Sequence, residues 1–306
     1  MQYKIGIDGG GTKTEYALFA DSRIPILSLT GRGSNHETLP GGMAEAASIL
    51  ADGIGRLLDT ANIPMNKISR AAMGLAGMDY PSQIRELTER LRALGIPNPV
   101  LCNDGFLIVK AGSPSGFGIG YNAGSGTCAV AIDQSGGMLQ FGGFSDFSGD
   151  KGNAYWNTAR TYRAVYDDVV LGLRKTLLTE LYFREFQIHT EEELIQSVQI
   201  LQSRQAASRI PVINTMLFTA AAANDTTAIQ ILDEITDRAS DFLSCLALRM
   251  PDMPDPIPVI LSGSVHCRQE CPLYIEQLRS KSVRKCRKNM EFSVLRDKPV
   301  IGAFYL

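Results

Sequence analysis

The sequence has no run of apolar residues long enough to cross a bilayer, which takes about 20. Neither sign of charge dominates, since 30 basic and 32 acidic residues leave a formal net charge of -2. We therefore expect neither a membrane nor a nucleic acid as partner. Histidine is scarce, with only 3 residues and no helical pairing, so a metal site built from histidines is not expected.

The first residues run directly into a strand-like pattern, without an apolar signal region, so we expect a cytoplasmic protein. Its 6 cysteines are then expected to be reduced thiols and not a disulfide framework. Cys267 and Cys271 lie close in sequence, but no further ligands follow with a spacing typical of zinc.

What the sequence does contain is a repeated α/β pattern within a length that favours two domains. Apolar runs and turn residues predict three strands at 3–8, 15–20 and 24–29, with a glycine turn after the first strand. Helix, strand, helix, strand and helix follow up to about residue 111. The strand–glycine turn–strand–strand pattern then returns at 116–121, 122–126, 127–133 and 138–141. Long helices between 153 and 250, strands at 259–261 and 292–295, and a helix near Ile275 complete this half.

The first glycine turn follows Asp8 and consists of Gly9, Gly10 and Gly11, with Thr12 and Lys13 after them. Bare glycines let backbone N–H groups point into a concavity that fits phosphate oxygens. Thr12 adds a hydroxyl, Lys13 adds a positive charge, and Asp8 could hold a hydrated Mg²⁺. An ordinary hairpin turn is the alternative. The turn runs into a strand and lacks the spacing of a P-loop or a Rossmann motif.

Two further turns add to a predicted phosphate site. The second turn offers the backbone of Gly124 and Gly126 and the hydroxyls of Ser125 and Thr127. A third turn, Gly263-Ser264, follows another predicted strand, and such strand ends are where α/β sheets bind ligands.

Asn103 and Asp104 stand at the end of a predicted buried strand. The Asp104 carboxylate could accept a proton from a substrate hydroxyl during phosphoryl transfer. The alternative is that Asp104 caps the helix that starts near Phe106, because aspartate is favoured at that position.

Polar, glycine-rich loops surround these candidates. One loop carries Asn35 and His36, and another carries Gly143, Phe144 and Asp150. Their amides and carboxylates suit hydrogen bonding to several hydroxyls, although each loop could also be a solvated turn.

Together these motifs resemble the sugar kinase branch of the actin-like ATPase superfamily, and most of all the N-acetylglucosamine kinases and the related benzoyl-CoA reductase-type ATPase family. The resemblance implies an α/β protein with two ribonuclease-H-like domains and a cleft between them. We expect an N-terminal domain over 1–113, joined by 297–306, and a C-terminal domain over 114–296. The implied cofactors are ATP and Mg²⁺, the implied substrate is an amino sugar phosphorylated at its 6-hydroxyl with Asp104 as catalytic base, and a homodimer is expected.

The resemblance also implies roles for individual residues. Asp8 would lie at the metal. ATP would be held by Gly9, Gly10, Gly11, Thr12, Lys13, Gly124, Ser125, Gly126, Thr127, Gly263 and Ser264. The sugar would be held by Asn35, His36, Gly77, Asn103, Asp104, Gly143, Phe144 and Asp150.

Three positions depart from the family pattern. The second turn lacks the usual threonine, Phe144 replaces a tryptophan, and Lys151 replaces a glutamate. Two other functions therefore stay open: an ATPase that activates an acyl-CoA dehydratase or reductase, and a non-catalytic sensor of sugar or nucleotide.

Overall fold

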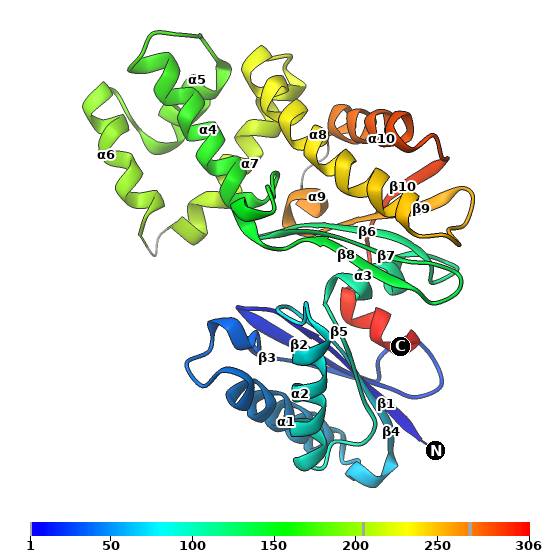
Figure 1. The fold of residues 1–306 in the computed structure, drawn as a ribbon. Coiled ribbons are helices and arrows are strands. Elements are labelled where there is room, and N and C mark those ends of the chain that lie inside the picture. Colours follow the sequence, from blue (N-terminus) through cyan, green and yellow to red (C-terminus); the bar gives the residue numbers. More distant parts are fainter. Residues whose placement is uncertain (1, 204–205, 269–270) are drawn as a thin grey trace.

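The computed structural model describes residues 2–203, 206–268 and 271–306 and contains two five-stranded mixed sheets (Figure 1). The first sheet has the order β3-β2-β1-β4-β5, and the second has the order β10-β9-β6-β7-β8. Their strands are β1 (Tyr3–Gly9), β2 (Lys13–Phe19), β3 (Leu27–Arg32), β4 (Ile68–Leu75), β5 (Pro99–Cys102), β6 (Gly118–Ala123), β7 (Thr127–Ile132), β8 (Met138–Gly142), β9 (Ile257–Ser262) and β10 (Met290–Val294).

The two sheets have the same topology. In the first sheet β1 pairs antiparallel with β2 and parallel with β4, and in the second β6 pairs antiparallel with β7 and parallel with β9. The repeat predicted from the sequence is therefore present, and the expected fold of two ribonuclease-H-like α/β units is confirmed.

The helices lie mainly in the second half of the chain. They are α1 (Gly42–Ala61), α2 (Pro81–Ala93), α3 (Gly105–Gly112), α4 (Ala154–Val169), α5 (Leu177–Phe186), α6 (Glu191–Leu201), α7 (Ala206–Ala222), α8 (Thr226–Arg249), α9 (Ser264–Arg268) and α10 (Pro272–Cys286), with 3₁₀ helices η1 (His36–Thr38), η2 (Met65–Lys67), η3 (Ser145–Phe147) and η4 (Pro299–Tyr305). No helix in these described ranges has the length and apolar content needed to traverse a bilayer.

The first sheet is covered on both faces. Ile5 and Ile7 of β1 are fully buried in the core that also contains α1 residues. The opposite face meets η4, where a side chain at Gly6 would lie 2.9 Å from the Cβ of Ala303 and 2.7 Å from the Phe19 ring. Glycine at position 6 therefore lets the C-terminal helix pack directly on the sheet.

Helix α3 lies between the two sheets (Figure 1). Its Leu107 packs with Ala72 of the first sheet, and its Val109 packs with Val130 of the second. This packing on both sides holds the N-terminal end of α3, where Asp104 lies, between the two halves of the molecule.

The sequence located most elements, but some limits were wrong. The third strand was expected over 24–29 and begins at Leu27 instead. Ile24 and Ile26 are exposed in the turn before it, with 75% and 57% of their surface accessible, and Pro25 between them has no N–H to donate to a sheet. Strand β6 extends through Asn122 and Ala123, so the second glycine turn is shorter than expected.

Segment η4 rejoins the N-terminal half, since it packs against β1, β4 and α3. This contact supports the proposed domain limits of 1–113 with 297–306 and of 114–296, which we keep as a proposal.

Candidate active site

The first glycine turn is a closed hairpin supported by a neighbouring loop. The Gly10 N–H donates to the Lys13 carbonyl (2.9 Å), and the Gly10 carbonyl accepts from the N–H groups of Ser34 (3.0 Å) and Asn35 (3.3 Å). The Thr14 hydroxyl donates to the Ser34 hydroxyl (2.9 Å). The loop predicted to hold the sugar is therefore tied to the turn predicted to hold phosphate.

The glycines of this turn differ in what surrounds them. A side chain at Gly9 would collide with the Ser34 hydroxyl and lie 2.6 Å from Leu75 Cδ2. A side chain at Gly11 would meet no described atom within 4 Å, and the Gly11 φ is not in the positive range that favours glycine. Neither packing nor backbone conformation requires glycine at position 11. Close approach of a ligand to the backbone would explain why glycine is present there.

Asp8 lies on β1 opposite Gly74 of β4 and shares its surroundings with other carboxylates. Burial, followed by the charges of Asp104 and Glu15, raises the pKa of Asp8 to about 7. Lys13 and Lys298 oppose this shift. A carboxyl group with a raised pKa next to two like charges is a place where a cation would be stabilised.

Lys13 has a partner within the protein. Its Nζ lies 2.8 Å from Glu15 Oε1, and Lys298 Nζ lies 3.2 Å from Glu15 Oε2. These bonds hold the pKa of Glu15 below its ordinary value in spite of burial. Lys13 remains 64% exposed, so its ammonium group is also accessible from solvent.

Asp104 occupies the N-cap position of α3, but its carboxylate makes no capping hydrogen bond within the described chain. The side chain of Asn103 accepts the Gly105 N–H instead (2.9 Å). Burial raises the pKa of Asp104 to about 6, a shift that the Gly105 N–H opposes and the charge of Asp79 increases. The carboxylate is therefore held near the end of a buried strand with a pKa suited to proton transfer near neutral pH.

The second glycine turn is also closed by a backbone hydrogen bond, although it is one residue shorter than the first. The Gly124 N–H donates to the Gly126 carbonyl (2.9 Å), and the Gly124 carbonyl accepts the Ala154 N–H at the start of α4 (2.8 Å). Side chains at Gly124 or Gly126 would meet no described atom within 4 Å. The Thr127 hydroxyl, by contrast, donates to the Lys151 carbonyl (3.3 Å) and is buried.

The third turn packs against the second. Gly263 has a φ of +90°, and a side chain there would collide with the Ala123 carbonyl. Ser262 pairs with Asn122 in the parallel β6–β9 ladder, so the carboxyl ends of these strands lie together. Ser264 follows at the start of α9 and is exposed.

Residues that flank the two glycine turns lie near Asp104. Asp8, which precedes the first turn, is close enough for its charge to couple with that of Asp104. Cys128, which follows the second turn, would lie 3.4 Å from a side chain at Gly105. The predicted base and the two predicted phosphate turns are thus brought to one region between the sheets.

Apart from Asn103 and Asp104, the residues predicted to hold the sugar form two groups. Asn35 accepts the Glu37 N–H through Oδ1 (3.0 Å), and a side chain at Gly77 would lie 2.5 Å from that oxygen. His36 Nε2 lies 3.4 Å from the amide nitrogen of Gln83. The structure therefore brings Asn35, His36 and Gly77 together beside the first turn.

The second group comes from the loop after β8. Asp150 is buried, and its two oxygens accept the Gly143 N–H (2.9 Å) and the Ser148 hydroxyl (2.7 Å). Asp150 therefore shapes this loop. The Phe144 ring is 43% exposed and lies 6.4 Å from the Tyr80 ring of the other half.

Asp79 is a site residue that the sequence reasoning missed. Its Oδ1 accepts the Asn103 amide (2.9 Å) and the Gln140 amide (2.7 Å), so one carboxylate oxygen links the loop after β4, the end of β5 and strand β8. A possible signal was its position just after a predicted strand end, which is where Asn103 and Asp104 also lie.

Comparison with known proteins identifies the family. Residues 5–304 match the model of the BadF/BadG/BcrA/BcrD ATPase family. The chain belongs to this family. The resemblance expected from the sequence is thereby confirmed, and so is the use of ATP that the family name states.

Relatives of this BadF-type ATPase include curated sugar kinases. It is 23% identical to the N-acetyl-D-glucosamine kinase of Dictyostelium discoideum over 317 aligned positions, which cover 99% of this chain and 96% of that protein. It is also 23% identical to the N-acetylmuramic acid/N-acetylglucosamine kinase of Clostridium acetobutylicum over 220 positions, covering 70% of this chain and 71% of that protein.

Solved structures show the same fold at lower identity. A protein assigned as an N-acetylglucosamine kinase in Chromobacterium violaceum superposes on this BadF-type ATPase with a TM-score of 0.68 and 19% identity, over 100% of this chain and 98% of the other. A glucokinase of Streptomyces griseus, solved with glucose and AMPPNP, gives a TM-score of 0.58 and 14% identity over 98% of this chain and 97% of the other.

Proposed function

We propose that this ATPase is a kinase that transfers the γ-phosphate of ATP to the 6-hydroxyl of an amino sugar similar to N-acetylglucosamine. The observation that carries the proposal is the Asp104 carboxylate, which makes no capping hydrogen bond within the described chain, has its pKa raised to about 6 and lies near Asp8 and Cys128, the residues that flank the two bare glycine turns. The activities named for the two curated relatives support the same substrate class.

In this proposal Asp104 accepts the proton of the sugar hydroxyl as its oxygen bonds to the γ-phosphorus and the bond to ADP breaks. General-base assistance of this kind contributes roughly 10²- to 10⁴-fold, and positioning and charge stabilisation supply most of the rest. Asn103 holds Asp104 in place, because the Asn103 side chain is hydrogen-bonded both to the start of α3 and to Asp79.

The phosphates of ATP would be held mainly by backbone N–H groups of Gly9 to Gly11 and of Gly124 to Gly126, with Thr12 and Ser125 adding hydroxyls. Gly263 and Ser264 would lie beside the nucleoside. Asp8 fits Mg²⁺, because its carboxyl pKa is raised first by burial and then by the charges of Asp104 and Glu15, and a bound cation would offset these effects. Mg²⁺ bound there would neutralise phosphate charge, and one protein carboxylate is a usual number for it in kinases.

The sugar would be bound by the group around Asn35, His36 and Gly77 and by the loop of Gly143 and Phe144, with the exposed Phe144 ring as an apolar surface for the pyranose. Asp150 would act through that loop, since both of its oxygens are used within it.

The test is a panel of amino sugars assayed for ADP release, with the phosphorylated position of the product assigned by NMR. We expect turnover with N-acetylglucosamine, N-acetylmuramic acid or glucosamine, and loss of at least 100-fold in kcat for Asp104→Asn with ATP binding retained. Asp59→Asn, an exposed carboxylate on α1, is the matched control and should act as wild type. Near wild-type turnover of Asp104→Asn, or no sugar-dependent ADP release with any sugar, would refute the proposal.

We further propose a cytoplasmic homodimer. Sedimentation equilibrium at micromolar concentration should give twice the chain mass of 33.3 kDa. A single species with the mass of one chain would contradict a dimer.

A further inference from the structure

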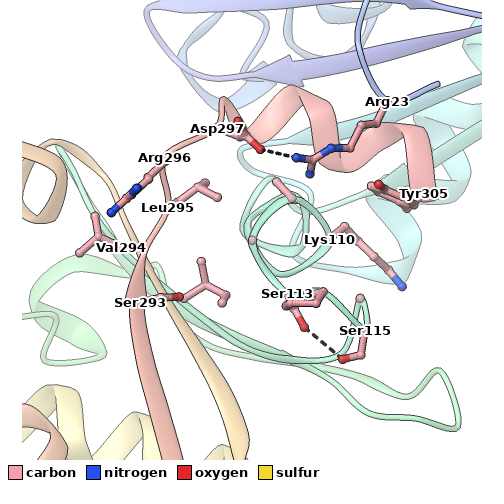
Figure 2. A pocket seen from close by; sticks show the side chains of 15 residues that line it. Arg23, Lys110, Ser113, Ser115, Ser293, Val294, Leu295, Arg296, Asp297 and Tyr305 are labelled. Carbon is pink, nitrogen blue, oxygen red and sulfur yellow. Dashed lines mark hydrogen bonds and ion pairs between the residues drawn. The ribbon is translucent and has the colours of Figure 1, made fainter.

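The two halves of the molecule are joined by the chain at one end of α3 and by side chains at the other. The chain passes between the halves after α3 and again after β10, and both crossings border a cavity of about 830 Å³ at the C-terminal end of α3 (Figure 2). Asp104 lies at the opposite end of this helix, whose 8 residues span about 12 Å. At the Asp104 end, the distance between the halves therefore depends on non-covalent contacts.

One carboxylate oxygen makes such a contact close to the proposed base. Asp79 Oδ1, in the loop after β4 of the first half, accepts the Gln140 amide of β8 in the second half (2.7 Å) and also the Asn103 amide (2.9 Å). A hydrogen bond to a charged acceptor is roughly twice as strong as a neutral one. Asp79 and Gln140 are both partly buried, which strengthens their bond further.

The main chain of Asp79 is fixed independently of Gln140. The N–H groups of Asp79 (3.0 Å) and Tyr80 (2.8 Å) both donate to Gln83 Oε1 in the first turn of α2. The carboxylate is therefore presented to the second half from a fixed helix end, and its position does not depend on the bond to Gln140.

From Asp79 the hydrogen bonds lead to the proposed base. The Asn103 amide donates to Asp79, and Asn103 Oδ1 accepts the Gly105 N–H (2.9 Å), so these two bonds fix the turn that carries Asp104. The charge of Asp79 also contributes to the raised pKa of Asp104, which places the two carboxylates in the same region.

From Gln140 the contacts lead to the loop proposed to bind the sugar. Gln140 Nε2 would lie 3.5 Å from a side-chain carbon at Gly143, and the ring of the next residue, Phe144, lies 6.4 Å from the ring of Tyr80. Two consecutive residues of the first half, Asp79 and Tyr80, thus meet β8 and the loop that follows it in the second half.

We propose that Asp79 is a positioning residue whose bond to Gln140 sets the distance between the Asp104 base and the sugar-binding loop of the other half. This inference rests on the proposed kinase function and adds to it a residue that does not touch the substrate. A base must lie within hydrogen-bonding distance of the hydroxyl that it deprotonates, and a displacement of about 1 Å costs about 10²-fold in rate. Loss of the bond should therefore lower turnover more than nucleotide affinity, because the glycine turns are unchanged.

Reversing the polarity of the bond tests the proposal. Gln140→Glu places a carboxylate against Asp79, and the repulsion should lower kcat at least tenfold with the amino sugar that the wild type turns over fastest. In Asp79→Asn/Gln140→Glu the asparagine amide donates to the new carboxylate, while its Oδ1 still accepts from Asn103. This double variant should regain a kcat within threefold of wild type.

Two measurements separate positioning from a general loss of structure. The Kd for AMPPNP, measured by calorimetric titration, should stay within threefold of wild type in every variant, and thermal unfolding by circular dichroism checks that each is folded. Gln140→Leu removes the donor without adding a charge, so it serves as the second variant if Gln140→Glu does not fold. Its kcat should fall by about threefold to tenfold.

Gln196→Glu is the matched control. Gln196 is exposed on α6, and its amide donates to the Glu192 carboxylate (3.0 Å) within that helix. The same substitution there creates a like-charge pair that does not connect the two halves, so kcat should stay within twofold of wild type.

The outcomes distinguish this inference from the proposed function. A folded Gln140→Glu protein with wild-type kcat, or a double variant no more active than Gln140→Glu, overturns the positioning role and leaves the kinase function standing. If the wild type releases no ADP with any sugar of the panel, both proposals are refuted.

Discussion

Replacing Gly11 by alanine tests whether glycine is required at this position by a bound ligand and not by the folded protein itself. An alanine Cβ at this position meets no described atom within 4 Å, and the φ is not in the positive range. The folded state should therefore lose nothing, and reduced freedom of the unfolded chain should stabilise the protein by about 0.4–1 kcal/mol.

ATP binding should respond in the opposite direction. If the backbone of Gly11 approaches a phosphate, the added methyl group displaces it and weakens one charge-assisted hydrogen bond, worth about 1.5–3 kcal/mol. Since 1.4 kcal/mol is tenfold in affinity, the Kd for ATP should rise about 10- to 100-fold. Urea unfolding measures the stability, and calorimetric titration with AMPPNP measures the affinity.

Two other glycines are the controls. Gly55 of α1 also faces open space but lies away from the turns, so Gly55→Ala should stabilise the helix by up to about 1 kcal/mol and leave the Kd unchanged. Gly9→Ala would collide with Ser34 and should destabilise the fold by about 1–3 kcal/mol. A Gly11→Ala protein that binds AMPPNP within twofold of wild type would refute the assignment of this turn to phosphate.

Three further outcomes are expected. The raised pKa of Asp8, about 7 against 3.8, means that the folded state holds this proton more tightly, so stability falls as pH rises from about 4 to 7. Asp8→Asn should remove that fall and raise the Tm of the ligand-free protein at pH 7.5, and an unchanged Tm–pH curve by calorimetry would contradict this. Because the pKa of Asp104 is about 6, kcat/KM should increase through pH 6 and level off above 7, whereas a flat profile from pH 5 to 8 would exclude it as base. Asp79→Ala leaves the amides of Asn103 and Gln140 without their acceptor, so it should lower the free energy of unfolding measured in urea by about 1–3 kcal/mol. Stability equal to that of the wild type would contradict this.

The repeated sheet was predictable because its signals are local. Apolar runs of strand length on either side of glycine turns recur in the two halves, and the structure has the same strand pairings in each. The start of β3 was not predictable in this way, because Ile24 and Ile26 are apolar and yet exposed. Hydrophobic composition predicts a strand only where another layer covers it.

The site was only partly predictable for a similar reason. Asp104 and the glycine turns follow strand ends, and a strand end can be recognised from neighbouring residues. The bond between Asp79, in the loop after β4, and Gln140, on β8, joins residues 61 positions apart in the two halves, so it depends on how these halves meet. No local spacing carries that information.

Several residues that were predicted as ligands from their type already have protein partners. The Thr127 hydroxyl, both Asp150 oxygens and the Lys13 ammonium group are bonded within the chain. For Lys13 the consequence is small, because an exposed ion pair is worth only about 0–1 kcal/mol. Glu15 would keep Lys298 at 3.2 Å if Lys13 turned to a phosphate, so the buried carboxylate would stay paired. Of these three residues, Lys13 is therefore the one that can move to a nucleotide without leaving a buried group unsatisfied.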